Sequence, residues 1–370
     1  NNQKPPHGGR TLALAREHGF PPEQILDFSS TLHPTPPKLD DALWKKAKKR
    51  IAYYPEDNFD GATEILSEIY GIPREWILPV AGAIDGLRLV MSLYRGSRIL
   101  AIEPGFSEYR WIAEAEGLEY HPLCMNPLAS AEEMLESFSK TARPEDLFLL
   151  CRPHNPSGVT IPLDQLQTFL SASQHARNPC ILDESLIEFT QDQAQNQSMA
   201  HSLADYPQVC LLRSMTKLWA IPGLRLGFIV SANAELRQLL MQRQLPWFMH
   251  SLAQAWLEHA CCKDEYEQRI QTAAALYSSA LDLAEQITMN PRWNTHLKGS
   301  SFFLIEIPET ISMSTLEQAL EAEGILVRFY EDEPASQLGR MIRVSARSPD
   351  ENRSLLVALQ KIPQDLFAHA

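Results

Sequence analysis

The sequence has few of the features that mark membrane proteins, nucleic-acid-binding proteins or exported proteins. No apolar run approaches the roughly 18 residues that a membrane-spanning helix needs. Basic residues are scarce relative to acidic ones, 33 against 46, and the formal net charge of −13 disfavours binding to nucleic acid or to anionic lipid. The first ten residues show no basic-then-apolar signal pattern. We therefore expect a cytoplasmic protein that binds a small molecule.

Cysteine is present but not in any pattern that indicates a metal or disulfide site. The six cysteines show no CxxC spacing and no histidine partners at the spacing of zinc ligands. We interpret them as buried thiols in a reducing compartment and expect no metal. They are Cys124, Cys151, Cys180, Cys210, Cys261 and Cys262.

The pattern of apolar segments predicts an α/β fold with a mostly parallel sheet. Between residues 76 and 231, short apolar runs alternate with helical patterns, as in βαβ units. The strands predicted there are Arg98–Glu103, Leu147–Arg152, Cys180–Asp183, Val209–Arg213 and Leu226–Val230. With 370 residues, about two domains are expected. We predict an N-terminal arm with part of a small domain (1–50), a large domain (51–248) and a smaller α+β domain (249–370).

Outside the predicted parallel sheet, the patterns are mainly helical. Leu39–Ile51 reads as a helix that ends in a basic cluster, which we interpret as solvated surface because cations suit a helix C-terminus. Further helices are predicted at Ser251–Gln286 and Thr315–Glu323, and further strands at Ser301–Ile307 and Met341–Ala346.

The most informative segment follows the strand that ends at Arg213. It reads Ser-Met-Thr-Lys217-Leu-Trp-Ala-Ile-Pro-Gly223-Leu-Arg225-Leu-Gly227. A lysine in this place could bind an aldehyde cofactor covalently, while nearby hydroxyls and a guanidinium hold a phosphate. Glycines 223 and 227 would permit close approach of the backbone. A lone lysine after a strand is more often a surface residue, so the interpretation depends on its neighbours.

Two other strand ends carry polar residues that suit the same ligand. Asp183 ends an apolar strand, where a carboxylate is expected to have a cationic partner such as a protonated pyridine nitrogen. Asn155 lies in a turn after another strand and could donate to a phenolate oxygen. Ligands of open α/β sheets bind in the crevice beyond the strand ends, so we expect these residues to converge.

These motifs resemble those of the fold-type I, pyridoxal-phosphate-dependent aminotransferases, in the branch that includes histidinol-phosphate aminotransferases and threonine-phosphate decarboxylases. The resemblance covers nearly the whole chain. It implies pyridoxal 5′-phosphate as cofactor and Lys217 as the lysine that binds it. It further implies that Ser214, Thr216 and Arg225 bind its phosphate, that Asp183 pairs with its ring nitrogen, and that Asn155 contacts its ring oxygen.

The resemblance also covers the phosphate loop, an aromatic residue and a subunit contact. Gly82, Ala83 and Ile84 occupy the phosphate loop, and because Ile84 supplies no hydroxyl, backbone amides would bind the phosphate there. Phe106 matches the aromatic residue that lies against the cofactor. Tyr54 matches a tyrosine that reaches the phosphate of the neighbouring subunit's cofactor, which implies a homodimer with shared active sites.

The reaction depends on how the substrate is anchored. Arg343 matches the family's carboxylate-binding arginine, and Arg328 matches a second arginine of the decarboxylase-like members. The segments His7-Gly-Gly9-Arg10 and Leu-Asp-Phe-Ser-Ser30 resemble the arm that closes over the substrate phosphate in threonine-phosphate decarboxylases. The resemblance therefore implies His7, Gly9, Ser30, Asn155, Arg328 and Arg343 as substrate-binding residues. Arg10 and His33 depart from the family and could rearrange the donors for the substrate's anionic end.

We therefore hypothesise decarboxylation of a phosphorylated hydroxy-amino acid. O-phospho-L-threonine, giving (R)-1-amino-2-propanol O-phosphate for cobalamin biosynthesis, is the first choice, and O-phosphoserine is a close competitor. The alternatives are an aminotransferase acting on histidinol phosphate or an aromatic amino acid, and a binding protein that keeps the fold without the chemistry.

Overall fold

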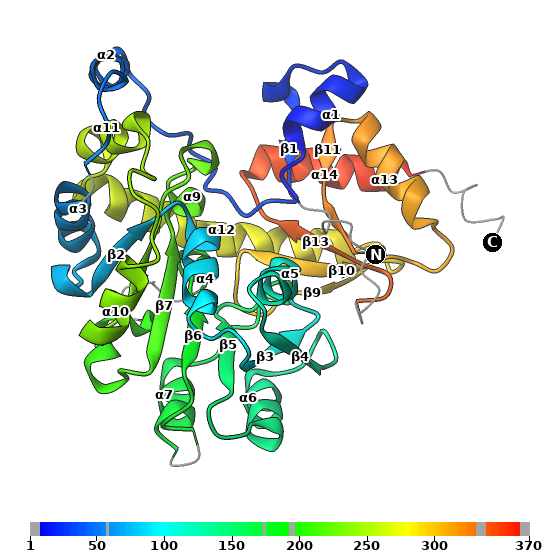
Figure 1. Ribbon diagram of the computed structural model, residues 1–370. Helices are drawn as coiled ribbons and strands as arrows, with labels where there is room; N and C mark the ends of the chain where they lie inside the picture. The colour runs from blue at the N-terminus through cyan, green and yellow to red at the C-terminus, as the bar shows by residue number, and fades with distance from the viewer. Residues whose placement is uncertain (1–7, 57–58, 173–174, 192–196, 331–337, 363–370) are drawn as a thin grey trace.

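A large seven-stranded sheet forms the centre of the molecule. The computed structural model describes residues 8–56, 59–172, 175–191, 197–330 and 338–362. The strand order is β2-β8-β7-β6-β5-β3-β4 (Figure 1). The strands are β2 (Ile77–Val80), β3 (Arg98–Glu103), β4 (Glu119–Cys124), β5 (Leu147–Cys151), β6 (Cys180–Asp183), β7 (Val209–Ser214) and β8 (Gly227–Val230). Strand β8 pairs antiparallel with β2 and β7, whereas the other pairings are parallel. The predicted α/β fold with a mostly parallel sheet is confirmed.

Helices cover both faces of this sheet because its strands are apolar on both sides. Along β7, Val209 and Leu211 pack into one core and Cys210 and Leu212 into the other, which is the alternation expected of a strand. One face is covered by α4 (Ala83–Ser92), α5 (Glu108–Ala115) and α10 (Ala234–Met241). The other face is covered by α3 (Asp60–Tyr70), α6 (Ala131–Thr141), α7 (Leu163–Ser171), α11 (Ser251–Ala260) and part of α12 (Lys263–Thr288).

A second, smaller sheet lies beside the first and is antiparallel. Its order is β12-β13-β10-β9, with β9 (Asn294–His296), β10 (Phe302–Glu306), β12 (Arg328–Phe329) and β13 (Met341–Ser345). Helices α13 (Met313–Ala322) and α14 (Pro349–Lys361) pack on it. The N-terminal segment joins this layer, because β1 (Leu26–Asp27), which follows α1 (Thr11–His18), pairs with β11 (Ile325–Leu326).

One long helix connects the cores of the two sheets. Helix α12 (Lys263–Thr288) places Tyr266 and Leu276 in the core of the large sheet and Leu283 and Ile287 in that of the small sheet (Figure 1). Helices α2 (Asp41–Arg50) and α11 (Ser251–Ala260) pack against each other and contribute to the large-sheet core. The division into 1–50, 51–248 and 249–370 stays a prediction. On both sides of its boundary at residue 248, Phe248 and Met249 pack in the same large-sheet core.

The remaining elements are short. They are α9 (Met215–Leu218) and the 3-10 turns η1 (Pro22–Gln24), η2 (Arg74–Trp76), η3 (Ile187–Phe189), η4 (Met199–Asp205) and η5 (Pro222–Leu224). Among the described helices, none combines the length and the apolar character needed to cross a bilayer.

Two predictions about local structure are wrong. The helix predicted at Ser251–Gln286 is interrupted at Cys261–Cys262, where extended backbone separates α11 from α12. The interpretation of all six cysteines as buried thiols fails for Cys124 and Cys262, which are exposed. Cys124 ends the edge strand β4, and Cys262 is the N-cap residue of α12. Both positions are defined by tertiary structure rather than by the local apolar pattern.

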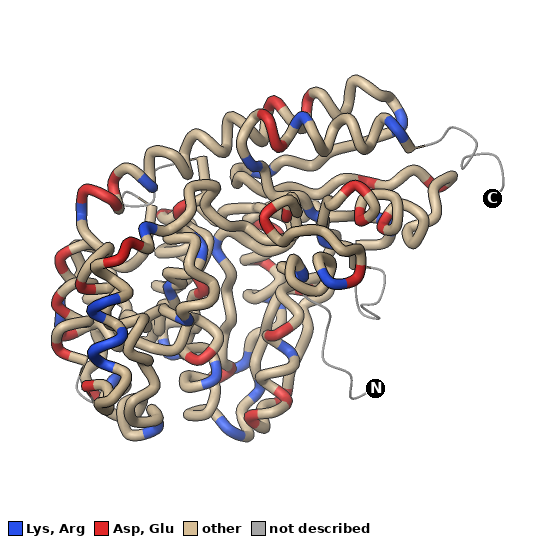
Figure 2. The backbone as a smooth tube through the Cα atoms, turned by 90° about the horizontal axis from the view of Figure 1, so that it is seen from above, with Lys and Arg blue, Asp and Glu red and all other residues tan. Residues whose placement is uncertain are grey.

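Acidic and basic residues are interspersed along the chain, and a run of basic residues lies on α2 (Figure 2). Within this run, Lys46 and Arg50 form ion pairs with Glu258, with nitrogen–oxygen distances of 2.6 and 2.7 Å. Lys45, Lys48 and Lys49 are exposed. The interpretation of this cluster as solvated surface is confirmed.

Candidate active site

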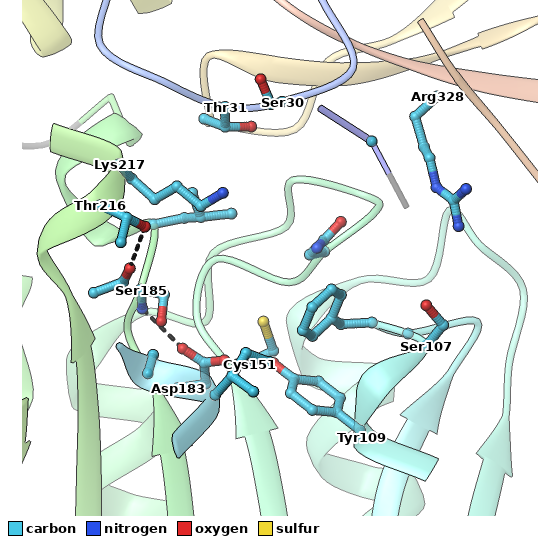
Figure 3. Close-up of a pocket in the computed structure, with 18 of the residues that line it drawn as sticks. Ser30, Thr31, Ser107, Tyr109, Cys151, Asp183, Ser185, Thr216, Lys217 and Arg328 are labelled. Atoms are coloured by element: carbon cyan, nitrogen blue, oxygen red, sulfur yellow. Dashed lines mark hydrogen bonds between the residues drawn. The ribbon is translucent and has the colours of Figure 1, made fainter. Parts of the chain in front are cut away.

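A cavity of about 270 Å³ lies where the ends of β5, β6 and β7 face the small sheet (Figure 3). Most of the predicted site residues line it, although they come from both sheets and from the N-terminal segment. Those residues are Ser30, Ala83, Ile84, Phe106, Asn155, Asp183, Ser214, Thr216, Lys217, Arg225, Arg328 and Arg343. The convergence of strand ends on one crevice is therefore confirmed.

Four of the predicted residues are not among those that line the cavity. Gly82 and Gly9 lie beside lining residues, Ala83 and Gly8 respectively. Tyr54 is 80% exposed and its ring lies 4.7 Å from that of Trp247, away from the cavity of its own chain. His7 lies outside the described residues.

Lys217 is held in the short helix α9 directly after β7. Its carbonyl oxygen accepts a hydrogen bond from the backbone of His33 at 3.0 Å, which ties it to the N-terminal segment. Its side chain points into the cavity (Figure 3). Burial lowers the pKa of Lys217 to about 8, and the positive charges of Arg343 and Arg225 act in the same direction. A lowered pKa increases the fraction of neutral amine, which is the form that attacks an aldehyde.

Asp183 lies at the end of β6, on the floor of the cavity. Its Oδ1 accepts a hydrogen bond from the Ser185 backbone at 2.9 Å, and its Oδ2 accepts one from the Tyr109 hydroxyl at 2.8 Å. Both donors are neutral groups, so neither supplies a positive charge to the carboxylate. The side chain can therefore still attract a cation, such as a protonated ring nitrogen.

The opposite end of the floor forms a cradle for an anion. Ser214 and Thr216 bring their hydroxyl oxygens within 2.8 Å of each other, and Arg225 lies against the turn before α4. Gly82 in that turn has φ 84°, and a Cβ atom there would lie 2.7 Å from Nη2 of Arg225. This φ favours glycine, because a side chain there would be strained and would require Arg225 to shift, and the first amides of α4 can face an anion.

Of the two glycines near Arg225, one is required by close packing and the other is not. A Cβ atom on Gly227 would lie 2.8 Å from the backbone nitrogen of Ala83, which confirms the predicted close approach. Gly223 has no atom within 4 Å of such a Cβ, so packing within the described residues does not require a glycine there and the prediction stays untested. Gly227 starts β8 under the phosphate-loop turn, whereas Gly223 lies in the exposed turn η5.

The upper wall of the cavity is cationic. Arg328 and Arg343 occupy opposite positions on β12 and β13, and each is 8% exposed. Arg343 donates to the side-chain oxygen of Asn155 and to the backbone oxygen of Ser29, while its Nε has no hydrogen-bond partner among the described residues. Because Asn155 accepts with its oxygen, its amide nitrogen remains available as a donor. Two guanidinium groups opposite each other repel, so an anion between them would be stabilised.

The N-terminal segment closes one side of the cavity through a hydrogen-bonded turn. Asp27 accepts from the backbone and hydroxyl of Ser29 at 2.9 and 2.5 Å, and from the Ser30 hydroxyl at 2.6 Å. Ser29 in turn accepts from the amide of Gly9 at 2.8 Å, which brings Gly8 into the cavity wall. The amide of Gly9 and the proton of the Ser30 hydroxyl are therefore engaged within the protein.

The suggestion that Arg10 and His33 supply donors for the substrate is wrong. Arg10 lies outside the cavity and pairs with Glu321 at 3.6 Å and with Glu17 and Glu317. His33 is buried against Arg269, and burial lowers the pKa of its imidazole to about 4. Sequence reasoning placed both near the substrate because their neighbours along the chain are there, but both side chains point elsewhere.

Sequence reasoning also missed a buried ionic network behind the cavity. Glu184 pairs with Arg152 at 2.8 Å and with Arg213 at 3.5 Å, and Arg213 also pairs with Glu188. Arg152, Glu184 and Arg213 each adjoin a cavity residue in sequence, so strand alternation turns them to the opposite face of the sheet. The sequence does contain a signal for this network, because three charged residues lie at the ends of three adjacent apolar strands.

The groups that line the cavity fit the phosphorylated aldehyde cofactor that the sequence predicts. Arg225, two hydroxyls and the start of α4 can hold a phosphate, and the turn at Gly82 has no room for a side chain. Asp183 can hold a cationic ring nitrogen, and Lys217 offers an amine with a lowered pKa. Each end of the cavity thus has the charge that the corresponding end of such a cofactor requires.

Comparison with known proteins identifies the same family along most of the chain. Residues 42–359 match the family described as Aminotransferase class I and II. Threonine-phosphate decarboxylase from Salmonella typhimurium is 28% identical over 363 residues, which cover 96% of each chain. A histidinol-phosphate aminotransferase from Francisella philomiragia is 25% identical over 346 residues, covering 89% of this chain and 91% of the relative. The crystal structure of histidinol-phosphate aminotransferase from Sinorhizobium meliloti in complex with pyridoxal-5′-phosphate has a TM-score of 0.78 at 18% identity, covering 99% of this chain and 96% of that one.

Proposed function

This chain belongs to the aminotransferase class I and II family and uses pyridoxal phosphate as its cofactor, and we propose that it decarboxylates a phosphorylated hydroxy-amino acid. The preferred substrate is O-phospho-L-threonine, which would give (R)-1-amino-2-propanol O-phosphate for cobalamin biosynthesis. O-phosphoserine is the second choice. The relative from Salmonella typhimurium, which aligns over 96% of the chain, supports this reaction.

The observation that carries the proposal is the pair of guanidinium groups above Lys217. Arg328 and Arg343 are both buried and lie on adjacent strands, facing the same cavity. A substrate with a phosphate and a carboxylate offers two anionic ends, one for each guanidinium.

Residues on the cavity floor are proposed to hold the cofactor. Arg225, Ser214, Thr216 and the amides of Ala83 and Ile84 bind its phosphate, and Asp183 holds the ring nitrogen as a cation. Asn155 donates to the ring oxygen, and Phe106 packs against the ring. When bound, pyridoxal phosphate withdraws electrons from the Cα bond that stands perpendicular to its ring.

Lys217 is proposed to bind the cofactor aldehyde and afterwards to move protons at the substrate's Cα. A substrate amine would take the place of the Lys217 amine on the cofactor, and the lowered pKa of Lys217 would allow it to exchange protons near neutral pH. In decarboxylation the Cα–carboxylate bond would break, carbon dioxide would leave without the bonding electron pair, and the protonated Lys217 amine would donate one proton to Cα. Arg328 and Arg343 select this bond by fixing the orientation of the substrate's two anionic ends.

Incubation with O-phospho-L-threonine tests the proposed reaction. We expect one carbon dioxide released for each aminopropanol phosphate formed, with no keto acid and no need for an amino acceptor. O-phosphoserine in a parallel assay shows how tightly the methyl group is recognised. Formation of keto acid with conversion of the cofactor to its amine form, without carbon dioxide, would sink the decarboxylase proposal.

A second candidate is an aminotransferase that acts on histidinol phosphate or an aromatic amino acid. The relative from Francisella philomiragia supports it, and the same Lys217 could move the Cα proton in that reaction. Transfer of the amino group from histidinol phosphate to 2-oxoglutarate would identify it. A chain that binds the cofactor but turns over neither class of substrate would instead be the inactive binding protein considered above.

We further propose that the protein is a homodimer in which Tyr54 reaches the partner's active site. The rings of Tyr54 and Trp247 contact each other on the surface at an interplanar angle of 35°, and Leu245, two residues before Trp247, is 67% exposed. Exposed apolar side chains that gather in this way are typical of contact surfaces. We expect sedimentation equilibrium to give twice the chain mass of 41.8 kDa and Tyr54→Ala to weaken cofactor retention. A monomer with full cofactor occupancy would contradict the proposal.

A further inference from the structure

Tyr109 links the two groups that are proposed to contact the cofactor ring. It is the second residue of α5, is 2% exposed, and lies beneath the cavity floor (Figure 3). Its hydroxyl donates to Oδ2 of Asp183 at 2.8 Å. Its ring packs edge-to-face on Phe106, with centroids 5.4 Å apart and an interplanar angle of 87°. A single side chain thus contacts both the acid and the aromatic wall.

We propose that Tyr109 is a positioning residue that fixes the Asp183 carboxylate under the cofactor ring. The inference rests on the proposed role of Asp183. Oδ1 is already fixed by the Ser185 backbone, so the Tyr109 hydroxyl is the donor that determines the position of Oδ2. With both oxygens held in place, the carboxylate would face a cationic ring nitrogen and stabilise its charge.

The titratable groups around Asp183 allow Tyr109 to act as a donor throughout the working pH range. Burial raises the pKa of Tyr109 well above its ordinary value, so its hydroxyl keeps its proton. Cys151, which lies next to Asp183 in the β5–β6 register, has its pKa raised by burial to about 12 and adds no negative charge. The positive charges nearby are Lys217 on α9, which interacts electrostatically with Asp183, and Arg343 on β13, whose charge acts on Cys151.

Loss of the Tyr109 hydroxyl should change the absorbance of the bound cofactor, whereas loss of a packing contact alone would not. In Tyr109→Phe the ring and its contact with Phe106 remain, but Oδ2 of Asp183 loses its donor, so the carboxylate would stabilise a cationic ring nitrogen less well. A positive ring nitrogen would repel a proton at the end of the cofactor that Lys217 binds. If the charge on the ring nitrogen is weaker, that proton persists to higher pH. The pH midpoint of the visible absorbance should therefore rise.

The experiment is a pH titration of the visible absorbance of the holoenzyme. We expect Tyr109→Phe to raise the midpoint by roughly half to one pH unit, and to lower kcat about tenfold with KM within about twofold. Tyr120→Phe is the matched control, because Tyr120 also donates to a carboxylate at 2.8 Å, that of Glu103, outside the cavity lining. It should leave the midpoint unchanged.

A double variant separates this inference from the assignment of Asp183 itself. Asp183→Asn should raise the midpoint further, and adding Tyr109→Phe to it should have no additional effect. A Tyr109→Phe midpoint equal to that of the unmodified protein, or a shift that persists in the Asp183→Asn background, would overturn the role of Tyr109. An unchanged midpoint in Asp183→Asn alone would instead overturn the proposed role of Asp183.

Discussion

Replacement of Lys217 by alanine should remove the visible absorbance of the holoenzyme and nearly all of its activity. The amine is the nucleophile proposed to bind the cofactor aldehyde, and no other lysine lines the described part of the cavity. Loss of proton transfer at Cα alone lowers the rate by about 10²- to 10⁴-fold, and loss of the covalent link adds to this. The change is measured by absorbance spectroscopy after soaking with pyridoxal phosphate and by the phosphothreonine assay.

The structure of the Lys217→Ala chain should otherwise be preserved. Cofactor can still be held through its phosphate, because Arg225, Ser214 and Thr216 do not depend on the lysine side chain. Fluorescence quenching should therefore detect bound cofactor that lacks the visible band. Lys140→Ala, on the exposed side of α6, is the control and should keep both band and rate. A Lys217→Ala spectrum identical to that of the unmodified chain would show that another amine binds the cofactor.

The sequence predicted the parts of the fold in which local pattern and tertiary environment agree. Strands β3 and β6 begin and end where the apolar runs do, because each is covered on both faces. Strands β2 and β4 were not among the predicted strands. Strand β4 is an edge strand whose residues are mostly not buried and include Pro122, so neither composition nor periodicity distinguishes it from a loop.

The direction of β8 could not be predicted for a different reason. It follows β7 after Lys217 and Arg225 without a long crossover helix, and its antiparallel pairing is compatible with that short connection. An apolar run carries no information about strand direction. The geometry of the phosphate cradle depends on it, because Gly227 meets Ala83 at this edge.

For the site, sequence identified residues by type and by position along strands but could not identify their partners. Asp183 was expected to need a cation, yet its hydrogen bonds within the chain come from Tyr109 and Ser185. Tyr109 comes 74 residues earlier, and no periodicity relates the two. Arg10 and His33 failed for the same reason, since their side chains are directed by Glu321 and Arg269 rather than by their sequence neighbours.

The network behind the sheet links the strand ends, and Glu184 contacts two of its arginines, so its replacement should lower stability strongly. Glu184 and Arg152 have fully buried side chains, and the glutamate also accepts from the Ser198 hydroxyl at 2.5 Å. Glu184→Gln keeps the shape but leaves Arg152 and Arg213 with less negative charge nearby. Removal of one partner from a buried pair costs about 3–5 kcal/mol, because the remaining charges stay buried.

The unfolding midpoint in denaturant measures this effect, and it is read on the cofactor-free chains because ligand binding would stabilise each chain according to its own affinity. Glu136→Gln is the matched control: its exposed pair with Lys140 on α6 should contribute only about 0.3–0.5 kcal/mol. Since Glu184 follows Asp183 directly, its loss should also loosen the carboxylate beneath the ring and weaken cofactor binding. A Glu184→Gln chain as stable as Glu136→Gln would mean that the network is neutral for stability, and that the strand ends are held by backbone pairing alone.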